Sequence, residues 1–207
     1  MLLIGACNYY HTIMPFMFEK INDYTEILMP DDLLSEHSII ADVREALDEE
    51  NCEDVEVVGW LYQFYISEKK DRVFDEVKKQ RRKVKEEELP AVTQLFTPHW
   101  IVKYLVENTL GRLWMQNHPE SALKEKMDYY IEPEETEDYL KIASPEDILI
   151  CDPACGSGHM LTYTFDILYE IYSEQGYSSR EITQNILEKN LTGLEIDERA
   201  GELASFA

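Results

Sequence analysis

The segment Asp147–Gly158 constrains the fold of this chain more than any other. It places a run of four apolar residues, Ile148–Cys151, before Asp152 and a Gly156-Ser-Gly158 turn. A short, continuously apolar run is typical of a buried parallel strand, and the apolar periodicity that follows predicts a helix over residues 159–172. A strand, a glycine turn and a helix in this order indicate the nucleotide-binding arrangement of an open α/β sheet, whose ligands lie beyond the strand ends.

The residue types of this turn suit a ligand that carries both a carboxylate and an amine. Gly156 and Gly158 lack a Cβ, so the backbone can turn tightly and approach a ligand closely. The helix N-terminus offers unpaired N–H groups to an anion, and the Asp152 carboxylate can pair with a cationic amine. S-adenosylmethionine has this polarity. The third glycine of the dinucleotide fingerprint and the lysine of a P-loop are both missing, which counts against NAD, FAD and a P-loop.

A second strand is predicted over residues 191–196, after a helix over 180–189. It carries Glu195 near its end, and Asp197 follows just beyond. An acid at the end of the second strand of such a unit typically receives ribose hydroxyls. The spacing from Gly158 exceeds the usual ~20 residues because of the additional helix. We favour a ribose contact by Glu195 over the alternative that Glu195 or Asp197 only caps the following helix.

The chain is predicted to form two parts, residues 1–88 and 89–207. Apolar periodicity predicts a helical N-terminal region, including a helix over residues 54–67. The end of this part is rich in both kinds of charge and holds a basic run at 78–83. Because acids follow that run at once, we interpret it as a solvated helix face or a linker in preference to a nucleic-acid contact.

A helix is predicted near the start of the second part, from Thr97 towards Gly111. Thr97 is a suitable N-cap. Pro98 suits the first helical position, where its missing N–H would have no partner in any case. Taken alone, this pattern indicates only a well-capped helix.

The charge balance bears on possible partners. The formal net charge is −23, whereas proteins that bind DNA usually show a basic footprint. We therefore expect these residues alone to bind duplex DNA poorly. Either the DNA-binding surface lies elsewhere in a longer protein, or the substrate is not DNA.

The remaining composition excludes several classes of protein. The four cysteines form no C-x-x-C pair, and no histidine cluster has metal-ligand spacing, so we predict no metal site. The same cysteine usage favours a reducing, cytoplasmic compartment over a disulfide framework. No apolar run reaches the length that spans a bilayer, so we expect no membrane partner.

Three stretches resemble motifs of N6-adenine DNA methyltransferases, in the group where the cofactor region precedes the catalytic region. They occur in the expected order as Leu95–His99, Asp152–Gly158 and Leu194–Asp197. The resemblance implies that the first folds over the methionine end of S-adenosylmethionine, the second binds the cofactor and the third binds its ribose. The implied cofactor-binding residues are Phe96, Thr97, Pro98, Asp152, Pro153, Ala154, Cys155, Gly156, Ser157, Gly158, Glu195, Ile196 and Asp197.

Three further stretches extend the resemblance over nearly the whole chain. Residues 14–24, 59–68 and 94–103 are similar to the PglX-type adenine-specific methyltransferases of BREX phage-defence systems. This resemblance implies an α/β fold: a helical N-terminal region, then the first part of a Rossmann-like S-adenosylmethionine-dependent methyltransferase domain. It also implies DNA as a partner, through regions mostly outside this chain, and possible contacts with other defence-system proteins.

The chain departs from that family in one respect. No Pro-Pro dipeptide occurs in it, whereas the family's catalytic motif is Asn-Pro-Pro-Tyr or Asp-Pro-Pro-Tyr. That motif hydrogen-bonds the adenine amine, whose lone pair is otherwise delocalised, and stacks on the flipped base. We therefore assign no catalytic residue and predict little or no turnover from these residues alone.

Three alternatives stay open at this point. The chain could be a catalytically inactive interaction or regulatory remnant of such an enzyme, which binding of S-adenosylmethionine would help to distinguish. It could belong to a methyltransferase that acts on RNA, protein or a small molecule, although the Phe96-Thr-Pro98 stretch favours the DNA adenine group. It could also come from an enzyme that carries a fused nuclease.

Overall fold

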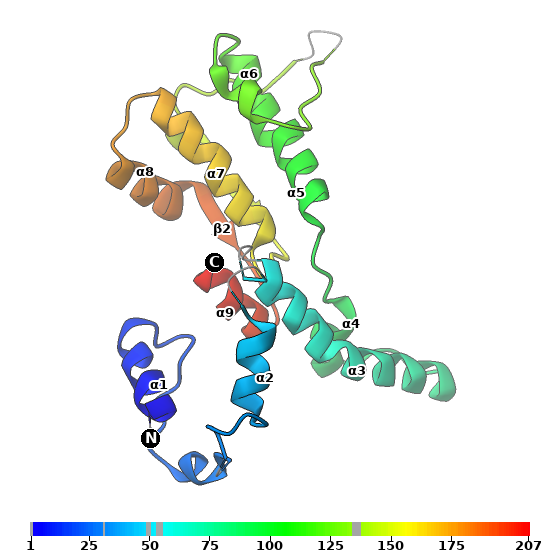
Figure 1. Ribbon diagram of the computed structural model, residues 1–207. Coiled ribbons are helices and arrows are strands. Elements are labelled where there is room, and N and C mark those ends of the chain that lie inside the picture. The colour runs from blue at the N-terminus through cyan, green and yellow to red at the C-terminus, as the bar shows by residue number, and fades with distance from the viewer. Residues whose placement is uncertain (1, 31, 49–50, 53–55, 134–137) are drawn as a thin grey trace. The chain divides into compact units, whose positions relative to one another are not determined.

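The structure, a computed structural model, describes residues 2–30, 32–48, 51–52, 56–133 and 138–207. The chain divides into two compact units, one ending at Tyr62 and the other comprising Gln63–Ser205. Figure 1 labels the helices α1–α9 and the strand β2. In chain order the elements are α1 Leu2–Ile13, η1 Tyr24–Leu28, α2 Ile39–Ala46, α3 Glu56–Gln80, η2 Glu86–Glu88, α4 Leu89–Thr93, α5 His99–Val106, η3 Glu107–Gly111, α6 Arg112–Asn117, η4 Ala122–Lys126, η5 Pro145–Asp147, β1 Ile150–Asp152, α7 His159–Glu174, α8 Ser179–Asn185, η6 Ile186–Asn190, β2 Leu191–Gly193 and α9 Glu198–Phe206.

The first unit is helical in its described residues. Ser38 is the N-cap of α2, and its side chain accepts the N–H of Ala41, which satisfies one donor of the first turn. The side chain of Asn8, on α1, forms two hydrogen bonds with the backbone of Ile21. These polar contacts fix the turn that follows α1.

Helix α3 crosses from the first unit into the second. It continues through the charged segment as far as Gln80. A helix therefore forms much of the stretch that the sequence analysis interpreted as either a solvated helix face or a linker. The predicted functional division between residues 88 and 89 stays a prediction. Across the described residues, no helix has the length and apolar character needed to cross a bilayer.

The second unit contains a two-stranded parallel sheet. Strands β1 and β2 pair with Ile150 opposite Leu191 and Asp152 opposite Gly193. Parallel strands need a long crossover, and the helices α7 and α8 with the π turn η6 provide it beside β2 (Figure 1). The predicted order of strand, glycine turn and helix is confirmed.

Both strands differ from their predicted bounds. The first was expected over residues 148–151 and the second over 191–196, whereas each pairs over three residues. Ile148 is buried, but the side chain of Leu149 is 79% exposed. A fully buried strand was therefore the wrong expectation for this position, because only one side of β1 is covered by described elements.

The core of the second unit lies between α5, α6, α7 and α8. Helix α7 contributes Ile167, Leu168, Ile171 and Tyr172, which share one face at the helical spacing. The buried cluster as a whole consists of Val102, Val106, Leu110, Trp114, Met115, Leu123, Met127, Ile148, Ile167, Leu168, Ile171, Tyr172, Ile182 and Ile186.

A buried asparagine joins the starts of the two strands. Asn190 is 1% exposed, and its amide nitrogen donates to the carbonyl oxygens of Pro145 (2.9 Å) and Ile148 (2.7 Å). Its amide oxygen accepts the hydroxyl of Tyr172 at 2.9 Å. One side chain thus ties the segment before β1, the end of η6 and helix α7 together.

Replacing Asn190 by leucine should lower the free energy of unfolding by about 2–4 kcal/mol, because it removes three hydrogen bonds between buried groups. Urea denaturation measures this change. Asn185→Leu is the matched control, since Asn185 is partly exposed and donates to Glu146, and it should cost less than about 1 kcal/mol. Equal losses in the two variants would contradict this role for Asn190.

Candidate functional site

The glycine turn lies at the junction of β1 and α7. Gly156 has φ +55° and Gly158 has φ +87°, a region that residues with a Cβ rarely occupy. Space is also restricted, since a Cβ on Gly156 would lie 3.1 Å from the Phe96 ring and one on Gly158 would lie 3.1 Å from the Ala204 Cα. Both the conformation and the packing therefore require glycine at these two positions.

The two predicted acids lie at the same edge of the sheet. The N–H of Leu194 donates to the carbonyl of Asp152 (2.9 Å), and the N–H of Cys155 donates to the carbonyl of Leu194 (3.0 Å). These bonds extend the pairing beyond β1 and β2 and bring Glu195 beside the glycine turn. The Oε2 atom of Glu195 then accepts the N–H of Gly156 at 2.7 Å.

Glu195 and Asp197 have different local roles. Asp197 is the N-cap of α9, where its side chain accepts the N–H of Arg199. The Oε1 atom of Glu195 accepts the N–H groups of Ile196 and Asp197 at 2.8 and 2.9 Å. Helix capping therefore belongs to Asp197, whereas Glu195 is directed to the glycine turn.

Asp152 and Cys155 complete the turn. The Oδ1 atom of Asp152 accepts the N–H of Ala154 at 3.1 Å, which rigidifies the chain where it leaves β1. Burial, with the nearby carboxylates of Asp152 and Glu195, raises the pKa of the Cys155 thiol. A protonated thiol is a poor nucleophile, and a Cβ on Gly193 would lie 3.0 Å from its sulfur, so Cys155 acts here as a packed side chain.

The Phe96–Pro98 segment lies against the glycine turn, although 60 residues of sequence separate Phe96 from Gly156. Phe96 is 3% exposed. Its N–H donates to the side chain of Gln63 at 2.9 Å, and its ring lies 5.6 Å, centroid to centroid, from that of His159. Together with the bond between Glu195 and Gly156, this contact brings all three sequence motifs together at the glycine turn.

The cap of α5 differs from the prediction. Pro98, rather than Thr97, occupies the N-cap position, and no side chain caps this helix. The N–H groups of Ile101 and Val102 donate to the carbonyl of Pro98. The helix thus begins one residue later than expected, which leaves Thr97 to line the neighbouring cavity.

Two buried polar side chains flank Gly158. Ser157 is 5% exposed and His159 is 7% exposed. Within the described part of the chain, neither the Ser157 hydroxyl nor either ring nitrogen of His159 has a hydrogen-bond partner. Because an unpaired buried polar group is costly, these atoms fit a site that binds a polar ligand or water. Sequence reasoning assigned no role to His159.

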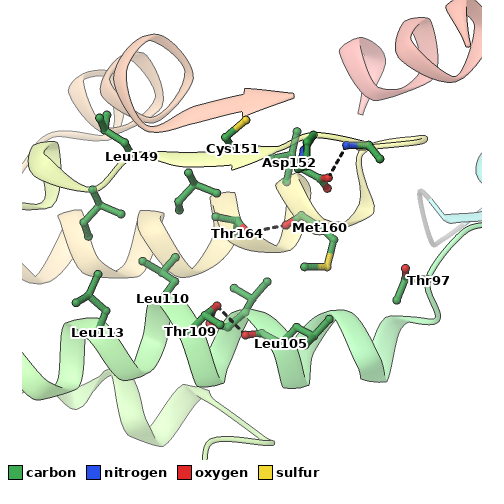
Figure 2. A pocket seen from close by; sticks show the side chains of 16 residues that line it. Thr97, Leu105, Thr109, Leu110, Leu113, Leu149, Cys151, Asp152, Met160 and Thr164 are labelled. Atoms are coloured by element: carbon green, nitrogen blue, oxygen red, sulfur yellow. Dashed lines mark hydrogen bonds between the residues drawn. The ribbon is translucent and has the colours of Figure 1, made fainter. Parts of the chain in front are cut away.

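A cavity of about 570 Å³ lies between α5 and strand β1. Figure 2 shows Thr97 and Asp152 at one end of it, with Leu105, Leu110 and Leu149 along its length. Pro153 and Ala154 also line it, whereas Gly156, Gly158 and Glu195 lie outside the lining. The predicted cofactor residues therefore divide between the end of this largely apolar cavity and the adjacent turn.

Comparison with known proteins relates the whole chain to two curated proteins. It is 51% identical over 215 residues to the "Adenine-specific methyltransferase BrxX" of Escherichia coli O9:H4 (strain HS), an alignment that covers 100% of this chain. It is 40% identical over 222 residues to the "Adenine-specific methyltransferase PglX" of Lacticaseibacillus casei (strain Zhang), covering 98% of this chain. The chain spans only 17% and 18% of the length of these relatives. No protein-family model matches the sequence. The resemblance to adenine-specific methyltransferases is confirmed.

Proposed function

Because the chain is homologous over its whole length to part of the adenine-specific methyltransferases BrxX and PglX, we propose that it binds S-adenosylmethionine in an enzyme that methylates adenine N6 in DNA. In this proposal residues 89–207 form the first half of a Rossmann-like methyltransferase domain. The observation that carries it is the 2.7 Å hydrogen bond from the Gly156 N–H to Glu195, which joins the glycine turn to the acid that follows the second strand.

The residues at this edge fit the chemical groups of S-adenosylmethionine. The Oδ2 atom of Asp152 can accept from the methionine ammonium, since the contact with Ala154 uses the other oxygen. The Ser157 and His159 side chains, which have no hydrogen-bond partner among the described residues, can hydrogen-bond the polar methionine end. A cavity of this volume, with a few polar groups at one end, is typical of a cofactor site. When bound, the cofactor supplies an activated methyl group.

Glu195 has little acceptor capacity left for ribose. Its carboxylate already accepts three backbone N–H groups, those of Gly156, Ile196 and Asp197, and a carboxylate offers about four lone-pair positions. One ribose hydroxyl can be added without loss, whereas a second must replace a backbone donor. The Gly156 N–H is the donor best placed to be released to a ligand, because it comes from a different segment of the chain.

DNA as substrate and phage defence as context belong to the same proposal. They are supported by the homology to BrxX and PglX and by the motifs of the BREX methyltransferases. The net charge of −23 is unfavourable for contact with DNA phosphates. We therefore assign most of the DNA contacts to regions outside these residues.

Glu195→Gln tests the proposed cofactor site. The amide keeps an acceptor oxygen but loses the charge, and hydrogen bonds to charged groups contribute roughly 1.5–3 kcal/mol. The dissociation constant for S-adenosylmethionine should therefore rise about tenfold to 100-fold. Isothermal titration calorimetry on the intact protein measures it.

Glu181→Gln is the control for this test. Glu181 also accepts a backbone N–H, that of Ser178 at 3.0 Å, but it does so in the capping box of α8, outside the proposed site. Its substitution should leave the affinity within about twofold. If the unaltered intact protein fails to bind S-adenosylmethionine, the proposed function is wrong and the reading as an inactive remnant is favoured.

A further inference from the structure

The two loops of the proposed cofactor site are each attached to the start of a helix. Helix α5 begins at His99, directly after the Phe96–Pro98 segment, and α7 begins at His159, directly after the glycine turn. These helices pack against each other along their length (Figure 1). The spacing of the two loops therefore depends on the register of α5 on α7.

Apolar packing between helices fixes this register only loosely, since ridges of side chains can fit neighbouring grooves. A directional contact is more restrictive. The hydroxyl of Tyr163, on α7, donates to the Oε1 atom of Glu107 at 2.6 Å. A slide of one helical turn would move these atoms apart by about 5.4 Å, so the bond exists in one register only.

Glu107 is held on both sides. It is fully buried, at 0% exposure, and its Oε2 atom accepts the N–H of Tyr129 at 2.5 Å. A buried carboxylate that lost either donor would carry a large penalty. Burial and the nearby Glu107 also raise the pKa of Tyr163, so its hydroxyl keeps the proton that it donates.

The same face of α7 contacts the beginning of α5. The ring of Tyr163 lies 5.9 Å from that of His99, and the Lys103 ammonium lies 5.8 Å from the Tyr163 ring centroid. One turn earlier on α7, His159 contacts Phe96. Tyr163 thus lies between Glu107 on one side and the contact of His159 with Phe96, at the proposed site, on the other.

We propose that Tyr163 and Glu107 are positioning residues for the cofactor: their hydrogen bond sets the register of α5 on α7 and so holds the Phe96–Pro98 segment against the glycine turn. This inference rests on the proposed function. Neither residue lines the cavity next to the turn, and neither belongs to the three sequence motifs. Their effect on the cofactor is therefore exerted through the two helices.

Tyr163→Phe removes only the hydroxyl, and Tyr172→Phe is its matched control. Tyr172 lies on the same helix and is fully buried, and its hydroxyl also donates one hydrogen bond, to Asn190, away from the proposed site. We expect Tyr163→Phe to raise the dissociation constant for S-adenosylmethionine about tenfold, as a coupled residue without ligand contact can. Tyr172→Phe should change the dissociation constant less than about twofold, even if it lowers the melting temperature as much as Tyr163→Phe does.

The measurement is calorimetric titration of the intact protein with S-adenosylmethionine, with melting temperatures recorded for each variant. The double variant Tyr163→Phe/Glu107→Leu should bind no more weakly than the weaker-binding single variant, since leucine cannot accept the Tyr163 hydroxyl and both changes therefore remove the same contact. The positioning role is overturned if Tyr163→Phe and Tyr172→Phe alter affinity equally, or if the double variant loses affinity additively. Absence of binding by the unaltered protein would overturn the proposed function and this inference together.

Discussion

Gly156→Ala is expected to destabilise the protein by about 2–5 kcal/mol and to weaken binding of S-adenosylmethionine at least about tenfold. The left-handed φ of +55° costs a residue with a Cβ roughly 1–2 kcal/mol. The new methyl group would also lie 3.1 Å from the Phe96 ring, and overpacking of this kind adds roughly 1–3 kcal/mol. Urea denaturation and calorimetric titration measure the two effects separately.

Gly176→Ala separates backbone strain from packing in this experiment. Gly176 has φ +82°, at the end of α7, and a Cβ there would have nothing within 4 Å. Its substitution should cost only the roughly 1–2 kcal/mol of strain and leave cofactor affinity unchanged. If the two glycine variants bind S-adenosylmethionine equally well, the close approach of Phe96 to Gly156 is irrelevant to the site.

The turn at Gly156 was predictable because its signals are local. An apolar run of strand length, glycines that permit positive φ and a helical period after them all fall within one stretch of sequence. The position of Glu195 was predictable for a related reason. Two parallel strands joined by a crossover place their carboxyl ends at the same edge, and the hydrogen bond between Glu195 and Gly156 agrees with that expectation.

The bounds of the strands were not predictable from the same pattern. The sequence pattern predicts a strand as far as residue 196, yet β2 ends at Gly193. Leu194 still bonds to Asp152, but Glu195 turns to the Gly156 N–H, so the regular ladder stops there. The contact of Glu195 with the distant Gly156 ends the strand. Contacts of this kind produce no periodic pattern in the sequence.

The cap of α5 shows a similar limit at the level of one residue. Thr97 and Pro98 permit either of two starts, and helix ends commonly shift by one or two residues. The structure begins the helix after Pro98 and leaves Thr97 at the cavity. The sequence alone does not distinguish the two starts.

The contact between Tyr163 and Glu107 could not be found by sequence reasoning, because 56 residues separate them and neither lies in a motif. A helical wheel assigns the buried stripe to Val102, Val106 and Leu110 and gives no reason to bury the adjacent acid. Glu107 begins a π turn, and single π turns often occur at functional sites. An unexpected buried acid in a predicted amphipathic helix would have been the only available signal.

Stability and cofactor affinity should therefore respond to different residues. The proposed site depends on a few directional contacts, such as those of Glu195 and Glu107, while the fold depends on the apolar cluster between α5, α6, α7 and α8. A substitution deep in that cluster should lower stability at least as much as the site variants do. It should leave the affinity of the molecules that remain folded nearly unchanged, since binding depends on local geometry.

Trp114→Ala provides this contrast. Trp114 is completely buried in α6 and stacks on His118 with 4.0 Å between ring centroids, so its truncation should cost about 3–5 kcal/mol and lower the melting temperature by roughly 10 °C. Trp100→Ala is the control: Trp100 is 59% exposed, and its loss should stay within about 0.5 kcal/mol. Titrations at a temperature where each variant is still folded should give matching dissociation constants for Trp114→Ala and the unaltered protein. A large loss of affinity in folded Trp114→Ala would show instead that the core and the site form one cooperative unit.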